Sequence, residues 1–535
     1  MPEFGVLNWT ILVCYIFANL VLGYYLGRKV ESTESFFLGN KTTPWWAIGI
    51  SVIATYVSAL SFLGGPAWAY TDGLSVMMIH MNYPLVIILV ITLFLPFFYN
   101  SGVASIYEYQ ERRFGAKSRS VIAAIFLITQ GFSAAAILYA TSLVLQFITG
   151  IDVTYAIFIV TIIALIYTVM GGITAVIWTD VIQGVVLFIG AGIILYALVT
   201  TMPGSLHESL VQMKALGKTD PFNFSFDFTQ VTTVWSGIIA MTVFHVTVYG
   251  VNQMMAQRTL AAKNLGDAKK SYLLMGFVAF FIYFLFIVLG VLFYAYYDGK
   301  EFENGNTIIL QFAANYGMPG LMGILAAAVM AASMSTLDSA FNSMSTVSIV
   351  DFYQRYFRPD ESDEHYLKAS RWFTLFWAAA IITPAIMFST TTGSILETLS
   401  KVGSYFVGAK LAMYGMGFFS KHTTERGLLV GVAAGFAVVW TVAATTDIAW
   451  PWYTLIGAGT NILVSWPVSL LLDGRQAEWS PYSVPGQKAK FKAENLAEKE
   501  NGWYVVPGRI DKISYLLLAF FFASFLFLYL FNAMI

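Results

Sequence analysis

LAAAVMAASMSTLDSAFNSMSTVSIVD, residues 325–351, is an apolar run long enough to cross a membrane, with hydroxyl groups and acids set into it. Ser335, Thr336, Asp338 and Ser339 follow one another at spacings that bring 335, 338 and 339, and likewise 336 and 339, onto one helical face. A carboxylate inside a membrane helix is so unfavourable that it indicates a function. This stretch therefore predicts a membrane helix that carries an ion-binding site.

Sodium is the ion that this group of oxygens suits. It is a hard cation that needs several oxygen ligands, and the hydroxyls of Ser335 and Thr336 can supply two of them at low charge. Backbone carbonyls from a broken helix can supply the others. A single hydroxyl in a membrane helix more often bonds to its own preceding turn or to a neighbouring helix. The pair beside Asp338 favours the ion site over that interpretation.

The composition of the whole chain predicts an integral membrane protein. Of its 535 residues, 58% are hydrophobic and 11% are charged, which is far outside the usage of soluble proteins. The net charge of −1 gives no reason to expect a nucleic-acid partner. The single cysteine, Cys14, excludes an intrachain disulfide and a cysteine-based zinc site.

A membrane-spanning helix needs about 20 apolar residues, and fourteen stretches of the chain meet this requirement. They lie at 7–27, 46–71, 75–99, 119–149, 153–173, 177–201, 232–256, 271–297, 318–350, 369–391, 397–419, 426–446, 449–472 and 512–534. No basic leader precedes the first stretch, so we expect it to be a retained helix. We expect one membrane domain over 1–535, with 512–534 as its last helix.

The distribution of basic residues predicts the orientation of these spans. With the N-terminus outside, alternate connecting segments hold every Lys and Arg except Lys214, Lys218, Lys300, Lys401 and Lys410. Basic residues gather on the cytoplasmic side, so both termini are predicted to be outside. The insert 473–511 then becomes a cytoplasmic linker, too short and too mixed in charge to be a signalling or catalytic domain.

Two of the predicted spans contain interruptions. The second contains Gly64-Gly65-Pro66, which weakens a helix, and the seventh contains His245 and Gly250. Because these spans are five apart, they predict an inverted repeat with halves at 46–201 and 232–419, the first helix of each half being broken. The alternative for Gly250 is a simple packing contact between helices.

Four sequence blocks resemble the sodium/solute symporter family, which includes sodium-coupled sugar, proline, sialic-acid, iodide and monocarboxylate carriers. The blocks are Ile106–Phe114, Tyr167–Gly184, Asn252–Asn264 and Ser335–Ser343. The resemblance extends from the first predicted span to at least the eleventh. It implies a LeuT-type fold, an all-α membrane protein with a 5+5 inverted repeat, one additional helix before the ten core helices and three after them.

The resemblance also implies two groups of ion ligands. For a first sodium ion they are the backbone carbonyls of Ala54, Val57 and Ala332 and the hydroxyls of Ser335 and Thr336. A possible second sodium would be bound by Asp180, Asp338 and Ser339. Family members commonly have Ser or Thr where this chain has Asp338. Two nearby acids could bind a second sodium, or one could stay protonated and give proton coupling. Alternatively, either acid could pair with a basic residue or cap a helix.

The substrate site matches no single branch of the family. Positions that contact sugar in the galactose branch correspond to Ser61, His80, His245, Ala279 and Ser400, and none keeps the residue type of that branch. The gate tyrosine of that branch falls at Val248, with Tyr249 adjacent. The arginine of the sialic-acid branch is absent from residues 130–137. We expect Ser58, Ser61, His80, His245, Tyr249, Ser400 and Lys410 to line the substrate site.

The histidines and Lys410 favour an organic anion, such as a sugar acid or other monocarboxylate, because these side chains can neutralise a negative charge. A neutral monosaccharide or polyol remains nearly as consistent with them, since imidazoles and serines also bind hydroxyls. Lys410 could instead pair with an acid or extend its amine to the membrane surface.

The sequence therefore predicts sodium-coupled symport of a small organic solute by alternating access, in a cell membrane such as a bacterial inner membrane. Its expected partners are sodium ions, the solute and membrane lipid, and we expect the monomer to function. A proton-coupled carrier of the same fold is the alternative, followed by a membrane sensor. An enzyme is not expected, because the spans contain no nucleophile and base pair and no metal-ligand spacing.

Overall fold

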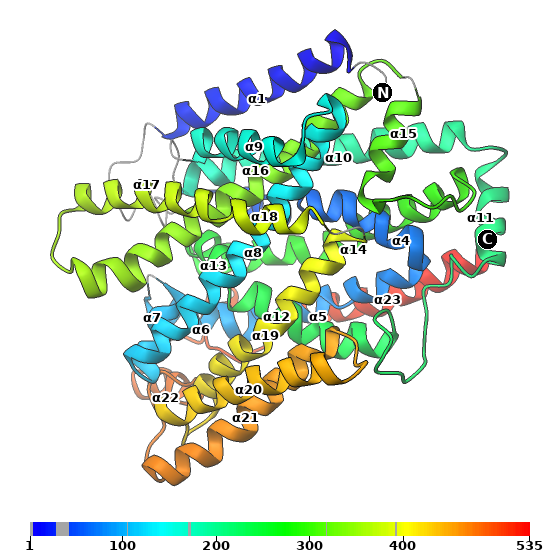
Figure 1. Cartoon of the computed structure of the whole chain (residues 1–535). Coiled ribbons are helices and arrows are strands. Elements are labelled where there is room, and N and C mark those ends of the chain that lie inside the picture. Colours follow the sequence, from blue (N-terminus) through cyan, green and yellow to red (C-terminus); the bar gives the residue numbers. More distant parts are fainter. Residues whose placement is uncertain (1–3, 28–41, 104, 169–172, 317, 391–392) are drawn as a thin grey trace.

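The computed structural model describes residues 4–27, 42–103, 105–168, 173–316, 318–390 and 393–535 as a large bundle of helices (Figure 1). Figure 1 places α1 (Gly5–Gly27) along one edge of this bundle, and α20 (Glu425–Thr445) and α21 (Pro451–Asp473) along the opposite edge. In the described residues, strands occur at β1 (Lys499–Glu500) and β2 (Trp503–Tyr504), which form a small antiparallel hairpin. The mainly helical class implied by the family resemblance is confirmed for the described residues.

The first half of the described chain continues with α3 (Trp45–Tyr56), η1 (Leu60–Gly64), α4 (Gly65–Asp72), η2 (Gly73–His80), α5 (Tyr83–Leu89), η3 (Val90–Phe94), α6 (Leu95–Ser101), α7 (Ile106–Arg113), α8 (Ala116–Thr149), α9 (Val153–Thr168), α10 (Ile173–Thr201) and α11 (Leu206–Ala215). The second half contains η4 (Ser236–Ala240), α12 (Met241–Gly250), α13 (Gln253–Leu260), α14 (Leu265–Tyr296), η5 (Gly305–Thr307), α15 (Ile308–Tyr316), α16 (Leu321–Val347), η6 (Ser348–Phe357), α17 (Asp363–Ala380), α18 (Ile382–Phe388), α19 (Ile395–Phe419), α22 (Val484–Ala493) and α23 (Lys512–Met534).

The length and composition of the helices confirm a multi-pass membrane protein. Within the described residues, ten helices are long and apolar enough to span a bilayer, or eleven if the bent pair α12 and α13 counts as one span. Helical segments overlap every predicted span, but Trp45–Tyr56 and Val153–Ile166 are shorter than a full span on their own. The count of fourteen stays a prediction. Most of the predicted connecting segment 28–45 lies outside the described residues.

The break in the second span was predicted at the wrong place. The backbone leaves the helix at Val57 and Ser58, after α3, and Gly64, Gly65 and Pro66 are inside the helical stretch formed by η1 and α4. Pro66 is the second residue of α4, which directly follows the π-helical turn η1, so the helix continues past the proline. A Cβ atom on Gly64 would lie 2.9 Å from the backbone nitrogen of Leu396, so this glycine allows α19 to pack closely.

The break in the seventh span is where the sequence predicts it. Helix α12 ends at Gly250, α13 begins at Gln253, and the two are bent by 51°. The side chain of Asn252 caps the new helix by accepting a hydrogen bond from the Met254 amide at 2.9 Å. Gly250 also serves packing, because an added Cβ would lie 3.0 Å from the Phe94 ring. Both interpretations of this glycine therefore hold.

Helix α16, which together with the start of η6 carries the stretch 325–351, is a central helix of the bundle. Of the 18-residue apolar window in the span Leu321–Phe357, 94% is buried within the protein, compared with 28% of the corresponding window in α23. Helix α16 packs against α1, α3, α8, α9 and α10. The hydroxyls and acids of α16 consequently face protein, which is the environment where polar groups in a membrane can find partners.

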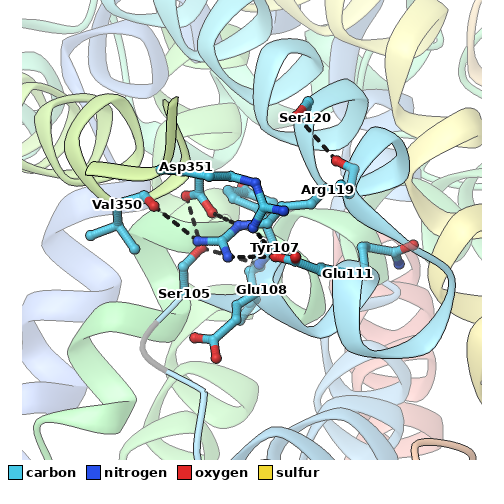
Figure 2. A network of polar contacts seen from close by, with 12 residues as sticks. Ser105, Tyr107, Glu108, Glu111, Arg119, Ser120, Val350 and Asp351 are labelled. Atoms are coloured by element: carbon cyan, nitrogen blue, oxygen red, sulfur yellow. Dashed lines mark hydrogen bonds and ion pairs between the residues drawn. The ribbon is translucent and has the colours of Figure 1, made fainter. Parts of the chain in front are cut away.

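A network of charged side chains connects the C-terminal end of this span to α7 and α8 (Figure 2). Asp351 in η6 pairs with Arg119 of α8 at 2.7 Å and accepts a hydrogen bond from the Ser105 hydroxyl at 3.0 Å. Glu111 of α7 joins the network by pairing with Arg119 at 2.9 Å and with Arg355. The network holds the end of the central helix against the segment that precedes α8.

The insert 473–511 is folded against the bundle. It contains α22 and the hairpin of β1 and β2. The amine of Lys269 in α14 lies 2.6 Å from the carboxylate of Asp511 and donates to the Tyr504 carbonyl at 2.7 Å. Asn100 donates to the Val505 carbonyl at 2.7 Å. The insert therefore buries polar groups against α6 and α14 instead of extending freely.

Candidate functional site

The end of α3 exposes backbone carbonyls at the predicted sodium site. In a continuous helix the Ser58 amide would bond to the Ala54 carbonyl, but here it bonds to Tyr56 at 3.1 Å. The Ser61 amide likewise bonds to Ser58 at 3.0 Å instead of to the Val57 carbonyl. The break therefore releases the carbonyls of Ala54 and Val57 from their usual helical partners, as a backbone ion ligand requires.

Two hydroxyls of α16 meet this region from the other side. The Thr336 hydroxyl lies 2.9 Å from the Thr55 carbonyl and 3.2 Å from the Ala332 carbonyl, so it joins α16 to the end of α3. The adjacent Ser335 hydroxyl donates to Asp180 at 2.6 Å. Ser335 and Thr336 are both buried. Of the predicted first group of ligands, Thr336 and Ala332 thus lie at the contact between the central helix and the end of α3, while Ser335 is directed at Asp180.

Asp180 pairs with a base, Arg258 of α13. The guanidinium lies 3.1 Å from the Asp180 carboxylate and donates to the Ser51 hydroxyl at 2.8 Å and to Ser339. Both charged side chains are fully buried. Arg258 belongs to the block 252–264 that carries the family resemblance, but the sequence assigned it no role. The structure therefore favours the ion-pair alternative for Asp180, and it places a fixed positive charge beside Ser339.

Asp338 has a different neighbour. Its carboxylate accepts a hydrogen bond from the Thr168 hydroxyl of α9 at 2.5 Å, and the side chain is buried. The three residues predicted for a second sodium ion thus divide between two environments. Asp180 and Ser339 share Arg258, while Asp338 contacts α9.

A cavity of about 150 Å³ lies beside the Thr336 hydroxyl. Thr336 is part of its wall, so the candidate ion site and the cavity share a boundary. Six of the predicted substrate-site residues also line it: Ser58, Ser61, His80, His245, Ser400 and Lys410. They come from the broken second span, from η2, from α12 and from α19. Residues separated by more than 300 positions in the sequence are therefore brought to one space.

Tyr249 was predicted to line this space, but it lies behind the wall. Its ring is 5.1 Å from that of Tyr56, which does line the cavity, and its carbonyl accepts a hydrogen bond from the Tyr272 hydroxyl. The neighbouring Val248 lines the cavity instead. The tyrosine adjacent to the gate position therefore supports the wall and does not face the cavity.

One wall of the cavity is built from stacked rings that the sequence analysis missed. His80, His245 and Tyr283 line the cavity. His80 stacks on Tyr283 with ring centres 3.7 Å apart, and His245 stacks at 4.7 Å on Tyr83, which lies behind the wall. The side-chain nitrogen of Asn82 donates to two carbonyls, and its oxygen lies 2.7 Å from Nδ1 of His245. Because that oxygen can only accept, Nδ1 of His245 carries the hydrogen and a neutral ring has Nε2 as its acceptor.

Lys410 lines the cavity from α19. Its amine donates to the Thr129 hydroxyl of α8 at 3.2 Å, and the residue is 5% exposed. Thr129, Gln130 and Ser133 line the cavity from α8. The sequence stretch that lacks the arginine of the sialic-acid branch thus still lines the cavity, with a lysine from another helix beside it.

Comparisons with known proteins agree with this architecture. The sequence profile described as the sodium:solute symporter family matches residues 36–435. The sodium/sialic acid symporter NanT of Aliivibrio fischeri is 28% identical over 473 residues, covering 87% of this chain and 93% of that protein. The sodium/glucose cotransporter of Vibrio parahaemolyticus is 29% identical over 463 residues, covering 81% and 84%.

Solved structures give the same result. A substrate-bound, outward-open Na⁺-coupled sialic acid symporter has a TM-score of 0.82 and 26% identity, and the match covers 89% of this chain and all of that one. Mhp1, a nucleobase-cation-symport-1 family transporter, shares the fold at a TM-score of 0.53 and 14% identity, covering 84% and 97%. The family match spans most of the chain and confirms the resemblance found in the motifs. The chain belongs to the sodium:solute symporter family.

Proposed function

We propose that this protein couples the movement of sodium down its gradient to the uptake of a small organic solute. The observation that carries the proposal is the position of Thr336, whose hydroxyl meets the end of α3 and also lines the cavity. An ion held at this contact would join α16 to the broken helix and complete one wall of the solute site. Sodium and solute would then stabilise the same arrangement of helices.

The proposed sodium ligands are the carbonyls of Ala54, Val57 and Ala332 and the hydroxyls of Ser335 and Thr336. The support for the first two is the shift of the Ser58 and Ser61 amides away from their helical acceptors. The hydroxyls are supported by their burial and by the approach of Thr336 to the end of α3. Five oxygens of low charge suit a hard monovalent cation.

A second sodium at Asp180, Asp338 and Ser339 has weaker support. The Arg258 guanidinium already neutralises Asp180 and donates to Ser339. We propose that Arg258 is the resident cation at this position, and that a second sodium binds there only if the guanidinium moves away. This favours one sodium ion for each solute.

Transport would proceed by alternating access of one membrane domain over residues 1–535, with fourteen spans and repeats at 46–201 and 232–419. The breaks at Val57 and at Val251 lie five predicted spans apart, as inverted repeats require. In the view of Figure 1 the start of α1 and the end of α23 lie toward the same end of the bundle, opposite α7, which supports placing both termini outside. The insert 473–511 would be cytoplasmic, and the monomer in a cell membrane would be the functional unit.

Sodium binding to purified protein tests the site without any knowledge of the solute. We expect Thr336→Ala to need at least a tenfold higher sodium concentration than the wild type for the same thermal stabilisation, because the substitution removes an ion ligand. Thr161→Ala is the matched control, since Thr161 is a buried threonine whose hydroxyl bonds within its own helix. Equal sodium responses in the two variants would refute the assigned site.

A further inference from the structure

Lys410 differs from the other buried basic side chains of the protein. Within the described residues four lysine and arginine side chains are buried: Arg119, Arg258, Lys269 and Lys410. The first three each have a carboxylate within 3.1 Å, namely Asp351, Asp180 and Asp511. Lys410 forms no ion pair in the described part of the chain. Its charge is therefore left for something other than a protein carboxylate.

The surroundings of Lys410 exclude two simpler explanations for a buried lysine, namely that its amine extends to the membrane surface or that it pairs with an acid. At 5% exposure its amine does not extend to the surface, and α19 continues past it in both directions. No Asp or Glu lines the cavity among the described residues. An ammonium group has three donors, and the structure gives Lys410 one acceptor, the Thr129 hydroxyl. Two donors thus remain for a group that enters the cavity.

The rest of the cavity wall is suited to an organic body. Apolar side chains that include Phe244, Phe406 and Val407 line it together with the stacked rings. A volume of about 150 Å³ matches cavities that hold a benzene-sized molecule. A single cation in the wall balances a single negative charge.

From these observations we infer that the solute is a small monocarboxylate, about the size of benzoate, whose carboxylate binds the Lys410 amine. This inference rests on the proposed function and specifies its substrate class. The α8 positions Thr129, Gln130 and Ser133 lie on the same wall as the amine and can add hydrogen bonds to the carboxylate oxygens. The Gln130 amide nitrogen lies 3.8 Å from the Met254 sulfur, a weak acceptor that a carboxylate would readily replace.

Paired probes separate the charge of a ligand from its shape. Purified full-length protein in sodium or in choline is mixed with benzoate or benzamide, nicotinate or nicotinamide, and propionate or propionamide, and thermal stabilisation is measured. Iodide, nitrate, glucose and sialic acid complete the panel. We expect at least one small acid to stabilise the protein more in sodium than in choline, and its amide to be without effect. A response confined to sugars, sialic acid or inorganic anions, or no response to any acid, would overturn the inference.

Variants of two lysines on α19 locate the contact. Lys410→Met removes one charge-assisted hydrogen-bonding partner and is expected to weaken binding of the acid about 10- to 100-fold. Lys410→Arg keeps the positive charge and is expected to retain part of the affinity for the acid. Lys401→Met is the control, because Lys401 is exposed on the same helix. Unchanged binding of the acid by Lys410→Met would overturn the assignment. Stabilisation by sodium alone is measured separately. If sodium does not stabilise the wild type, the proposed sodium coupling is wrong. If sodium still stabilises Lys410→Met, the variant is defective only in binding the solute.

Discussion

Replacement of Arg258 by methionine is expected to be among the most damaging single changes in the protein. Methionine preserves much of the volume but removes the guanidinium, which bonds to Asp180, Ser51, Ser339 and the Met254 carbonyl. Asp180 has no exposed surface, so its charge would be left buried and uncompensated. Breaking a buried pair in this way costs about 3–5 kcal/mol.

A second substitution should recover part of this loss. Asp180→Asn in the same chain removes the unpaired charge, and groups in direct contact typically show coupling of about 0.5–3 kcal/mol. We therefore expect Arg258→Met to melt at a lower temperature than the double variant when both are purified in detergent. Arg112→Met is the control, because Arg112 forms an exposed pair with Glu108 that contributes about 1 kcal/mol or less.

The order of melting temperatures decides the question. Suppose that adding Asp180→Asn lowers the stability of Arg258→Met by the same amount by which it lowers that of the wild type. The two residues would then not be coupled, and the buried ion pair would be wrong. If Arg258→Met is as stable as Arg112→Met, then Arg258 is not the cation that balances Asp180.

Two further predictions concern packing and acid stability. Gly408→Ala should destabilise the protein by about 1–3 kcal/mol in thermal melting, because the new Cβ would lie 2.3 Å from the Thr454 carbonyl, whereas Gly415→Ala on the same helix meets nothing within 4 Å and should be nearly neutral. Partial burial raises the pKa of Glu111, but hydrogen bonds and charge from Arg355 and Arg119 lower it more, so its pKa lies below the ordinary value of 4.5. The stability that Glu111 gains from Arg119 and Arg355 is therefore present above about pH 4.5 and is lost as the pH falls through the pKa of Glu111 in the folded protein. Melting of Glu111→Gln should vary less with pH over that acidic range than melting of the wild type, and identical profiles would contradict the network in Figure 2.

Much of the fold was accessible from the sequence because membrane helices obey one simple requirement. Each must satisfy its own backbone in lipid, so length and hydropathy alone locate most of the spans. The break in the second span was misplaced because Pro66 suggests a break, yet the helix continues past it at the junction of η1 and α4. The real break depends on a contact between distant segments, in which the Thr336 hydroxyl approaches the Thr55 carbonyl.

The candidate site was likewise predictable from the sequence only in part. Ser335 and Thr336 could be found from their spacing within one helix. Arg258 could not be assigned, because its partner Asp180 lies 78 positions away and only the fold brings them together. The stacked rings were missed for the same reason: Tyr83 and Tyr283 look like ordinary aromatic residues until His80 and His245 are placed beside them. Spacing predicts groups on one helix, and it carries no information about which helices face each other.

The ion pair between Asp180 and Arg258 has a consequence for the proposed sodium site. The Ser335 hydroxyl donates its hydrogen to Asp180, so its lone pairs are left to point elsewhere, including toward a cation beside Thr336. Arg258 keeps Asp180 in place through the second carboxylate oxygen and at the same time balances its charge. The pair can therefore orient a sodium ligand without binding sodium itself. In that arrangement the acid beside the ion site favours sodium binding by directing a hydroxyl, and its own charge is already neutralised by the arginine.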